Sequence, residues 1–308
     1  YEQLEGDVAF YLEHQEYQHG YSRGTGCIMA SLIAGALALG STAGDAVTMA
    51  KMQMANGWQQ PFSIDEKTGT LGLSQWQDPM QYQAGSELTV NLPDVFRYES
   101  NKQLDFPRCE LPLGLYPIFD RVEWLERILP LGIRIAQIRI KDLEGDLLKQ
   151  EIQKAVDIAK QYDCQLFIND YWQLAIECGA YGVHLGQEDI DDADLQAIAD
   201  AGLRLGLSSH CFYEVARAKT INPSYIAFGP VYETQTKNMP WIPQGPQGLH
   251  YWRAHLPEMP MVAIGGIHGG RFTAVKQTGV DSIAMITAIT LADSPEQAIL
   301  DYISLFDS

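Results

Sequence analysis

The last two thirds of the chain repeat one pattern, in which a short apolar run is followed by a segment of helical periodicity. The runs are rich in Val, Ile, Leu and aromatic residues, whereas segment 148–160 (LKQEIQKAVDIAK) spaces its apolar residues as one face of a helix requires. Apolar strands that alternate with amphipathic helices are typical of a parallel sheet covered by helices. The predicted strands are 116–120, 135–141, 165–170, 182–186, 204–209, 225–231, 261–267 and 282–288.

This repetition predicts the fold class. Eight strand–helix units in roughly 190 residues fit a compact (β/α)8 TIM barrel, an α/β fold. A doubly wound open sheet is the alternative, but even repetition of the units favours closure. In such a barrel the functional residues lie where the strands end, in the loops at the carboxyl face.

The first hundred residues have a different pattern. We predict a strand at 8–12, a buried helix built from the small apolar residues of 27–39, and a second helix at 46–54. The run 27–39 is too short to span a bilayer, and these few elements make too small a core for an ordinary independent domain. We therefore expect three parts: an N-terminal segment at 1–56, an irregular linker at 57–110 and the barrel at 111–308.

Composition narrows the possible partners and the compartment. The 308 residues contain 21 Lys and Arg against 39 Asp and Glu, a formal net charge of −18. That charge argues against binding to nucleic acid or to an anionic membrane surface. The 5 cysteines form no C-x-x-C pair, and no signal peptide is evident, so neither disulfides nor structural zinc is expected. We expect a cytoplasmic protein that acts on small molecules.

The second predicted strand ends in alternating polar residues, Gln137, Arg139 and Lys141. Because side chains alternate along a strand, all three should point into the barrel. A buried Arg and Lys are costly unless they are paired, so we expect an anion beside them. The alternative is a pair of structural residues that form ion pairs within the protein.

Two aspartates lie where neighbouring strands end, Asp170 as the last residue of the third strand and Asp189 after the fourth. Adjacent parallel strands lie about 4.8 Å apart, so these carboxylates can converge on one cation. Carboxylate, water and phosphate oxygens are the usual ligands of Mg²⁺. Helix capping is the alternative for each aspartate, and the basic residues on the adjacent strand favour the metal.

The remaining strand ends carry groups suited to phosphate. Ser208 ends the fifth strand, and a long loop with hydroxyl and ammonium groups at 234–237 follows the sixth. Gly266 and Thr287 lie at the ends of the seventh and eighth strands, where barrels recurrently bind phosphate through backbone N–H groups. No partner acid and base support a Ser–His nucleophile, and we expect His184 and His210 to support other site residues or to be structural. The site therefore suits two phosphorylated groups and a divalent cation.

The segment from about residue 113 to the C-terminus resembles thiamine phosphate synthase, which joins the two heterocycles of thiamine. The resemblance extends through the whole predicted barrel, and its departures are mild, with Leu207, Ser209 and Thr287 where Val, Thr and Ser are usual. The matching motifs are QIRIK from Gln137, INDYWQLA from Ile168, YGVHLGQED from Tyr181, GLSSH from Gly206, TQTK from Thr234, AIGGI from Ala263 and IAMITAI from Ile283.

This resemblance implies a role for each site residue. It implies that the pyrimidine pyrophosphate is held by Gln137, Arg139, Lys141, Asn169 and Ser208, with Lys237 reaching the pyrophosphate. It implies Mg²⁺ on Asp170 and Asp189, and thiazole phosphate on Thr234, Thr236, Gly266, Ile286 and Thr287. The residues expected to assist the reaction directly are Arg139, Lys141, Ser208 and Lys237.

The N-terminal segment resembles the end of a hydroxymethylpyrimidine phosphate kinase of the ribokinase-like fold. The resemblance rests on RGTGC at Arg23 and the helix after it, and implies an anion hole at Gly24, Thr25 and Gly26 with Cys27 at the position of the base. It covers only the end of such a domain. We therefore expect a partial ribokinase-like segment and no kinase activity in this chain.

Together these observations predict a thiamine phosphate synthase that releases pyrophosphate with the help of Mg²⁺. One alternative is a thiazole tautomerase of the same barrel group, which isomerises one substrate and releases no pyrophosphate. Another is a non-catalytic scaffold that uses the kinase remnant as a docking surface. The sequence leaves open whether the chain forms a homo-oligomer, the order of substrate binding and whether the thiazole is carboxylated.

Overall fold

A computed structural model of the chain describes residues 10–15, 23–64, 69–72, 78–79, 90–97, 104–234 and 241–308. Their contacts separate two compact units. The first combines the described parts of Tyr1–Asp78 and Gly85–Gln103 with Cys211–Ile221, and the second spans Pro79–Ala84, Leu104–His210 and Asn222–Ser308. The second unit contains every strand of the barrel.

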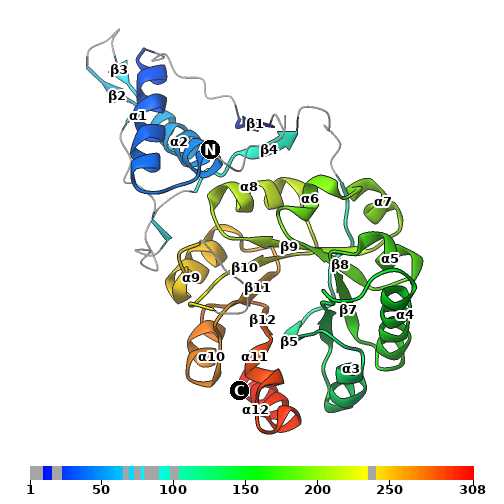
Figure 1. Ribbon diagram of the computed structural model, residues 1–308. Coiled ribbons are helices and arrows are strands. Elements are labelled where there is room, and N and C mark those ends of the chain that lie inside the picture. The colour runs from blue at the N-terminus through cyan, green and yellow to red at the C-terminus, as the bar shows by residue number, and fades with distance from the viewer. Residues whose placement is uncertain are drawn as a thin grey trace. The chain divides into compact units, whose positions relative to one another are not determined.

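Eight parallel strands form a closed barrel in the order β10-β11-β12-β5-β6-β7-β8-β9 (Figure 1). Closure occurs where β12 pairs with β5, with Ser282 opposite Gly114 and Met285 opposite Pro117. The prediction of a TIM barrel is thereby confirmed, and the open sheet is excluded. The strands are β5 (Gly114–Phe119), β6 (Ile135–Ile138), β7 (Gln165–Asn169), β8 (Gly182–Leu185), β9 (Arg204–Ser209), β10 (Tyr225–Phe228), β11 (Met261–Ile264) and β12 (Ser282–Met285).

Several strands end earlier than the apolar runs that predict them, and local backbone chemistry explains why. Strand β11 stops at Ile264 because Gly265 and Gly266 take φ values of 104° and 64°, which are outside the strand region. Strand β6 stops at Ile138, before Arg139 and Lys141. The residues after each stop form the carboxyl rim of the barrel.

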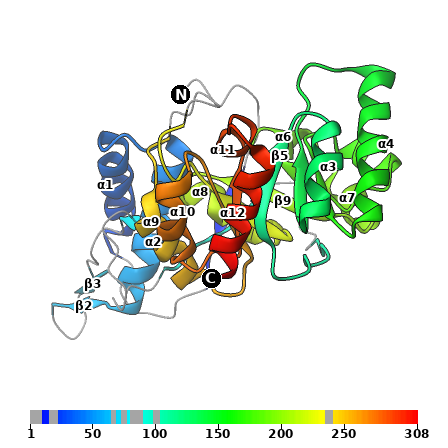
Figure 2. The ribbon, with the colours of Figure 1, turned by 90° about the horizontal axis from the view of Figure 1, so that it is seen from below.

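Helices follow the strands and lie outside them (Figure 1). The C-terminal helix α12 contacts α3, α10 and α11, so it joins the last strand–helix units to the first, and Figure 2 shows it beside α10. The helices after β5 are α3 (Glu123–Ile128), the 3-10 turn η2 (Leu129–Leu131), α4 (Gly145–Gln161), α5 (Trp172–Glu177), α6 (Asp189–Asp192), α7 (Leu195–Asp200), α8 (Phe212–Ile221), α9 (Gly245–His255), α10 (Gly269–Lys276), α11 (Thr287–Thr290) and α12 (Pro295–Asp307).

The barrel interior is filled by large side chains from strands that are not neighbours. The rings of Tyr116 on β5, Phe167 on β7 and Tyr225 on β10 meet at centroid distances of 5.1–6.1 Å, in tilted or edge-on arrangements that favour aromatic pairs. All three side chains are buried. The interior is therefore a packed core, and ligands must bind at its rim.

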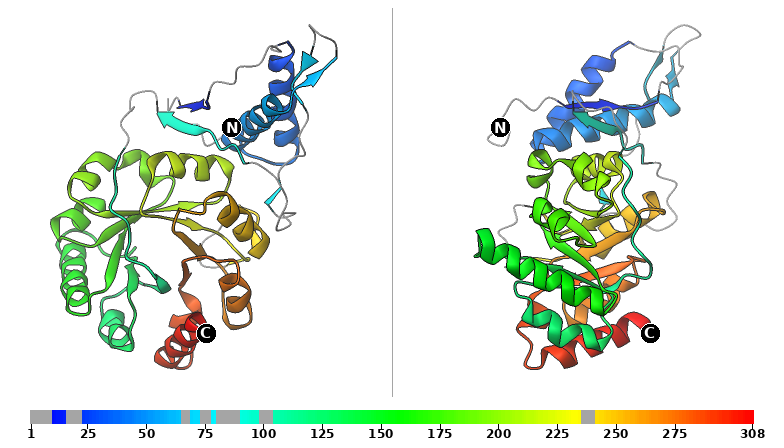
Figure 3. Two further views of the ribbon diagram at one scale, coloured as in Figure 1. Left: turned by 180° about the vertical axis from the view of Figure 1, so that it is seen from behind. Right: turned by 90° about the vertical axis from the view of Figure 1, so that its right-hand side faces the viewer.

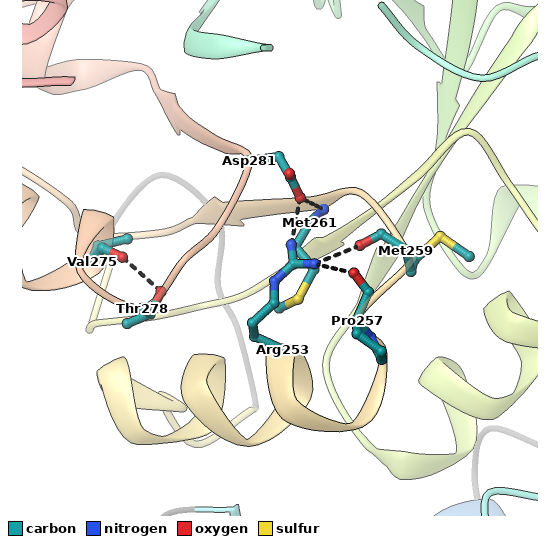
Figure 4. A network of polar contacts seen from close by, with 7 residues as sticks. All are labelled: Arg253, Pro257, Met259, Met261, Val275, Thr278 and Asp281. Atoms are coloured by element: carbon teal, nitrogen blue, oxygen red, sulfur yellow. Dashed lines mark hydrogen bonds and ion pairs between the residues drawn. The ribbon is translucent and has the colours of Figure 1, made fainter. Parts of the chain in front are cut away.

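A cluster of polar contacts connects the amino ends of β11 and β12 to α9 (Figure 4). The guanidinium of Arg253 on α9 forms an ion pair with Asp281 and donates to the carbonyl oxygens of Pro257 and Met259, over 3.0 and 3.3 Å. The Asp281 carboxylate also accepts from the backbone N–H of Met261 over 2.7 Å. These contacts fix the loops at the end of the barrel opposite to the predicted site.

The described part of the first unit contains three helices, α1, α2 and α8, and two small sheets. Helices α1 (Thr25–Ala38) and α2 (Ala43–Gln59) pack together (Figure 3). Helix α2 also packs on α8, where the Asp45 carboxylate accepts from the backbone N–H of Tyr213 over 3.0 Å. The antiparallel strand pairs are β1 (Phe10–Glu13) with β4 (Asp94–Arg97), and β2 (Phe62–Ser63) with β3 (Gly69–Thr70).

Two expectations for this unit need correction. Helix α1 was expected to be buried, but its only buried residue is Ala36, and Leu37 and Leu39 are 46% and 77% exposed. An apolar sequence predicts burial but does not supply the surface that covers it. Segment 57–110, expected to be irregular, begins with the end of α2 and contains β2, β3 and β4. The described part of this unit is thus small and mixed, and nothing in it identifies a ribokinase-like sheet.

Among the described helices, none combines the length and the apolar composition needed to cross a membrane.

Candidate active site

The carboxyl rim of the barrel brings most of the predicted site residues to one region of the fold. Gln137 lies near the end of β6, Asn169 ends β7, and Ser208 is the last residue but one of β9. Gly266 and Thr287 follow β11 and β12. Thr236 and Lys237 lie outside the residues that the structure describes.

The two predicted metal ligands come together. Asp170 and Asp189 interact through their carboxylates, and the pKa of Asp189 is raised, first by burial and then by the negative charge of Asp170. The Nζ of Lys141 forms an ion pair with Oδ2 of Asp170. The rim therefore holds two mutually repelling carboxylates with one ammonium group against them, an arrangement that a further cation would stabilise.

Backbone geometry holds both aspartates in place. Asp170 has a φ of 64°, a left-handed conformation that aspartate tolerates better than most residues, and its N–H donates to the His184 carbonyl over 2.9 Å. The backbone N–H of Gly186 donates to Oδ2 of Asp189 over 3.0 Å. A Cβ at Gly186 would lie 2.9 Å from the same oxygen, so a larger residue there would displace the carboxylate.

The donor set fits a hard divalent cation that keeps part of its own coordination shell. Asp170 and Asp189 supply carboxylate oxygens, which Mg²⁺ prefers. Across the described ranges, no group of three or more His, Cys, Asp or Glu side chains is arranged to hold a metal. A cation at these two aspartates would therefore take its remaining ligands from water or from a phosphorylated substrate.

The other residues of this part of the rim differ in exposure. The side chain of Gln137 is 3% exposed and that of Asn169 is 7% exposed, whereas Arg139 is half-buried and Lys141 is exposed. The sequence predicted that Gln137, Arg139 and Lys141 all point inward along one strand. Since β6 ends at Ile138, the two cationic residues instead belong to the loop after it.

Ser208 ends a polar chain that sequence analysis did not find. Its Oγ lies 2.9 Å from Nε2 of His184, whose Nδ1 lies 2.8 Å from the hydroxyl of Tyr225. The Tyr225 hydroxyl lies 2.9 Å from that of Tyr116, which accepts from Nε2 of Gln137 over 3.1 Å. Burial lowers the pKa of His184 to about 4, so its imidazole is neutral near pH 7. The available signal was a tyrosine at the start of each of two mainly apolar strands, 116–120 and 225–231.

The ends of β11 and β12 lie at the carboxyl rim, where Gly265 and Gly266 pack against residues 230–233. A Cβ at Gly266 would lie 2.4 Å from the carbonyl oxygen of Glu233, so this residue must be glycine. The guanidinium of Arg271 donates to the Gly266 carbonyl over 2.8 Å and lies over the ring of Tyr232, 4.4 Å from its centroid. Thr287 is exposed and is the first residue of α11. Ile286, half-buried, packs against the core.

The residues of the predicted kinase anion hole belong to the other unit. Gly24 has a φ of 78° and directly precedes α1, which begins at Thr25 and continues through Gly26 and Cys27. The Cys27 side chain is exposed. These residues are a helix start preceded by a left-handed glycine.

Comparison with known proteins places the barrel among its relatives. The family model for thiamine monophosphate synthase matches residues 115–289. The thiamine-phosphate synthase of Yersinia pseudotuberculosis is 50% identical over 202 residues, 66% of this chain and 94% of that protein. The enzyme of the same name from Photorhabdus laumondii is 51% identical over 193 residues, 63% of this chain and 89% of that protein.

A solved structure agrees with the sequence comparisons. The thiamine phosphate pyrophosphorylase from Pyrococcus furiosus superposes with a TM-score of 0.58 at 29% identity, covering 64% of this chain and 96% of that chain. The match to the family model begins at residue 115, so it leaves the N-terminal region unassigned. The barrel is therefore a thiamine-phosphate synthase, and the chain belongs to the thiamine monophosphate synthase family.

Proposed function

We propose that the barrel couples 4-amino-2-methyl-5-(diphosphooxymethyl)pyrimidine with a thiazole phosphate, giving thiamine phosphate and pyrophosphate. The observation that carries this proposal is the convergence of Asp170, Asp189 and Lys141 at one rim. A pyrophosphate leaving group carries several negative charges, and a site that stabilises it must supply positive charge. The Lys141 ammonium would supply part of it, and a divalent cation bound by the two carboxylates would supply the rest. Simple isomerisation of a thiazole would not need that arrangement.

The bond to be broken joins the pyrimidine methylene carbon to a pyrophosphate oxygen. The electron-rich aminopyrimidine stabilises positive charge on that carbon as the pyrophosphate leaves with the bonding electron pair. Gln137, Asn169 and Ser208 would orient the substrate, while Arg139 and Lys141 would stabilise the departing charge. Lys237 and Thr236 retain the roles in pyrophosphate and thiazole phosphate binding that the resemblance implies for them.

We assign the metal site to Asp170 and Asp189. Mg²⁺ bound there would neutralise charge on the pyrophosphate and so lower the barrier to its departure. In the structure the Lys141 ammonium pairs with Asp170. When substrate and cation bind, this ammonium would turn from the carboxylate to the pyrophosphate.

The second substrate supplies the new bond. Its ring nitrogen attacks the methylene carbon, and its phosphate would be anchored by Thr234, Gly266, Ile286 and Thr287. The two glycines after β11 have φ values of 104° and 64°, and the space that their Cβ atoms would fill is taken by residues 230–233, so both positions need glycine. Fixing both reactants side by side at the rim converts an encounter in solution into a reaction between neighbours, which contributes much of the rate.

The direct test is incubation of the whole chain with both phosphorylated heterocycles and Mg²⁺. We expect stoichiometric release of pyrophosphate together with a coupled product of the mass of thiamine phosphate. An isomerised thiazole formed without pyrophosphate would instead indicate a tautomerase. Binding without turnover would indicate a scaffold. Carboxylated and uncarboxylated thiazoles should be tested side by side.

For the rest of the chain we propose that residues 1–56 are the end of a ribokinase-like kinase domain, joined by 57–110 to the barrel at 111–308. The exposed apolar helix α1 supports this proposal, because in a complete domain such a helix would pack on a sheet. The chain should not phosphorylate hydroxymethylpyrimidine phosphate with ATP. Detectable phosphorylation in a mass assay would contradict this.

We also propose that the enzyme works in the cytoplasm. All five cysteines are unpaired in the structure, as a reducing compartment would keep them. Three of them, Cys109, Cys164 and Cys178, are buried.

A further inference from the structure

Five polar side chains form one continuous hydrogen-bonded chain across the barrel interior. It runs from the Gln137 amide to the Tyr116 hydroxyl, then to Tyr225, then through both ring nitrogens of His184 to Ser208. Its two ends are residues to which the proposed function assigns substrate contacts. The three residues between them have no role in that chemistry so far.

The number of donors and acceptors fixes which group donates at each hydrogen bond of this series. The Tyr116 oxygen accepts from the Gln137 amide, so its own proton needs another acceptor. Within the described part of the chain, the remaining hydrogen-bond partner of this hydroxyl is Tyr225. Tyr116 is 1% exposed, and a buried hydroxyl proton without an acceptor is costly. Tyr116 therefore donates to Tyr225.

The direction continues to the rim. Having accepted from Tyr116, the Tyr225 hydroxyl donates to Nδ1 of His184, 2.8 Å away. A neutral imidazole then carries its proton on Nε2, which donates to Oγ of Ser208 over 2.9 Å. The Ser208 hydroxyl proton is left for an acceptor outside the chain. Ser208 is half-buried, so a ligand at the rim can receive it.

The opposite direction leaves a proton unmatched. If Nδ1 of His184 carried the proton, it would donate to Tyr225, and Tyr225 would donate to Tyr116. The Tyr116 oxygen would then accept twice, and its own proton would face only the N–H of Gln137. A doubly protonated His184 gives the same conflict, because its Nδ1 also donates.

We propose that Tyr116, Tyr225 and His184 are positioning residues that fix Ser208 as a hydrogen-bond donor to the substrate, with the Gln137 amide setting the direction. The identity of the substrate rests on the proposed function. The direction of the hydrogen bonds is independent of the proposed function. Pyrophosphate oxygens only accept hydrogen bonds, so a serine held as a donor attracts this group, whereas one held as an acceptor would repel it.

The first test uses the unaltered, ligand-free full chain. Nitrogen-15 NMR of its histidine side chains reports which ring nitrogen carries the proton, and the His184 signals are assigned by their loss in His184→Gln. We expect a neutral ring protonated on Nε2. A ring protonated on Nδ1, or on both nitrogens near pH 7, would overturn the proposal.

The second test removes one hydroxyl from the chain. Tyr225→Phe leaves Nδ1 of His184 without its donor, so the two tautomers should mix and kcat/KM for the pyrimidine substrate should fall about tenfold. The KM for the thiazole phosphate should stay unchanged, which a general loss of structure would not produce. Tyr116→Phe should act in the same way but more weakly.

Tyr181→Phe is the matched control, because Tyr181 also packs on Phe167 but its hydroxyl accepts from the backbone N–H of Glu110 instead of joining the chain. Its kinetics should stay within about twofold of the unaltered protein. A folded Tyr225→Phe that behaves like this control would refute the positioning role. Should Tyr225→Phe not fold, the NMR measurement and Tyr116→Phe decide.

The two proposals fail in different ways. A protein that shows the Nε2 tautomer of His184 but releases no pyrophosphate contradicts the proposed function and supports the direction of the hydrogen bonds. An active enzyme with the Nδ1 tautomer contradicts the direction alone.

Discussion

The barrel and the N-terminal unit are built from similarly apolar sequences but use them differently. Every barrel strand has a neighbour on both sides, because closure removes the edges. In the first unit each described sheet has two strands, and helix α1 buries a single residue, Ala36. A closed and packed scaffold can hold polar groups in fixed positions, whereas exposed apolar faces need a further surface. The chemistry should therefore reside wholly in the barrel.

Two histidines make the same contrast at the level of side chains. Burial lowers the pKa of His14 in the first unit to about 4, with help from Lys51 and Lys219, and burial lowers that of His184 in the barrel to the same value. Both ring nitrogens of His184 are hydrogen-bonded, whereas Nε2 of His14 is buried with no partner among the described residues. The two histidines share a lowered pKa, so the pKa does not distinguish them. Their hydrogen bonds do.

The largest effect should come from the carboxylate pair. Asp170→Ala removes one of the two proposed metal ligands and the partner of Lys141, so pyrophosphate release should fall about 10³-fold or more even at saturating Mg²⁺. Asp192→Ala is the control, since this exposed aspartate lies on α6 with Asp189. Near-normal turnover by Asp170→Ala would show that the reaction does not depend on a metal bound at Asp170.

Lys141→Met should have the next largest effect. The substitution keeps the apolar stem but removes the ammonium that faces Asp170, so kcat/KM for the pyrimidine substrate should fall about 10²-fold. The matched control is Lys149→Met, which removes an ammonium from the exposed pair with Glu177 on α5. If both variants lose activity equally, the loss is due to the change in net charge and not to the position of the Lys141 ammonium at the rim.

The sequence predicted the barrel because closure depends on a pattern repeated eight times, and small errors in strand ends do not alter it. It also predicted that Asp170 and Asp189 converge, because carboxyl ends of neighbouring parallel strands meet at one edge. Neither inference requires knowledge of side-chain packing. Both follow from the order of elements along the chain.

The polar chain through the interior could not be predicted in this way. Tyr116 and Tyr225 are 109 positions apart, on β5 and β10, which are not neighbours in the barrel. Their hydroxyls meet only across the closed interior, at a distance that side-chain packing sets. The exposure of α1 was missed for a related reason, since an apolar sequence does not reveal whether its covering surface is present.

The third prediction concerns acid stability of the barrel. In the unfolded chain His184 has a pKa near 6.5, and in the folded chain about 4. Between these values the unfolded state binds a proton that the folded state does not, so stability falls as pH falls. Between pH 6.5 and pH 5 this group should remove about 2 kcal/mol from the free energy of unfolding.

Denaturant titrations at both pH values measure this effect. The comparison is the pH dependence of the unaltered protein against that of His184→Gln, whatever the absolute stability of the variant. The variant should lose less stability on acidification. Identical pH dependence in the two proteins would mean that His184 already carries its proton in the folded state.

The smallest effect should come from the N-terminal unit. Cys27 stands at the position that the kinase resemblance assigns to a base, yet its side chain is exposed on α1, which belongs to a different unit from the barrel strands. Cys27→Ser should therefore leave kcat/KM for coupling within about twofold and stability within about 0.5 kcal/mol. Both are measured by pyrophosphate release and denaturant titration, beside Lys141→Met as the variant expected to report on the rim. A loss of coupling comparable to that of Lys141→Met would show that the chemistry is shared between the two units, because no contact within the barrel explains it.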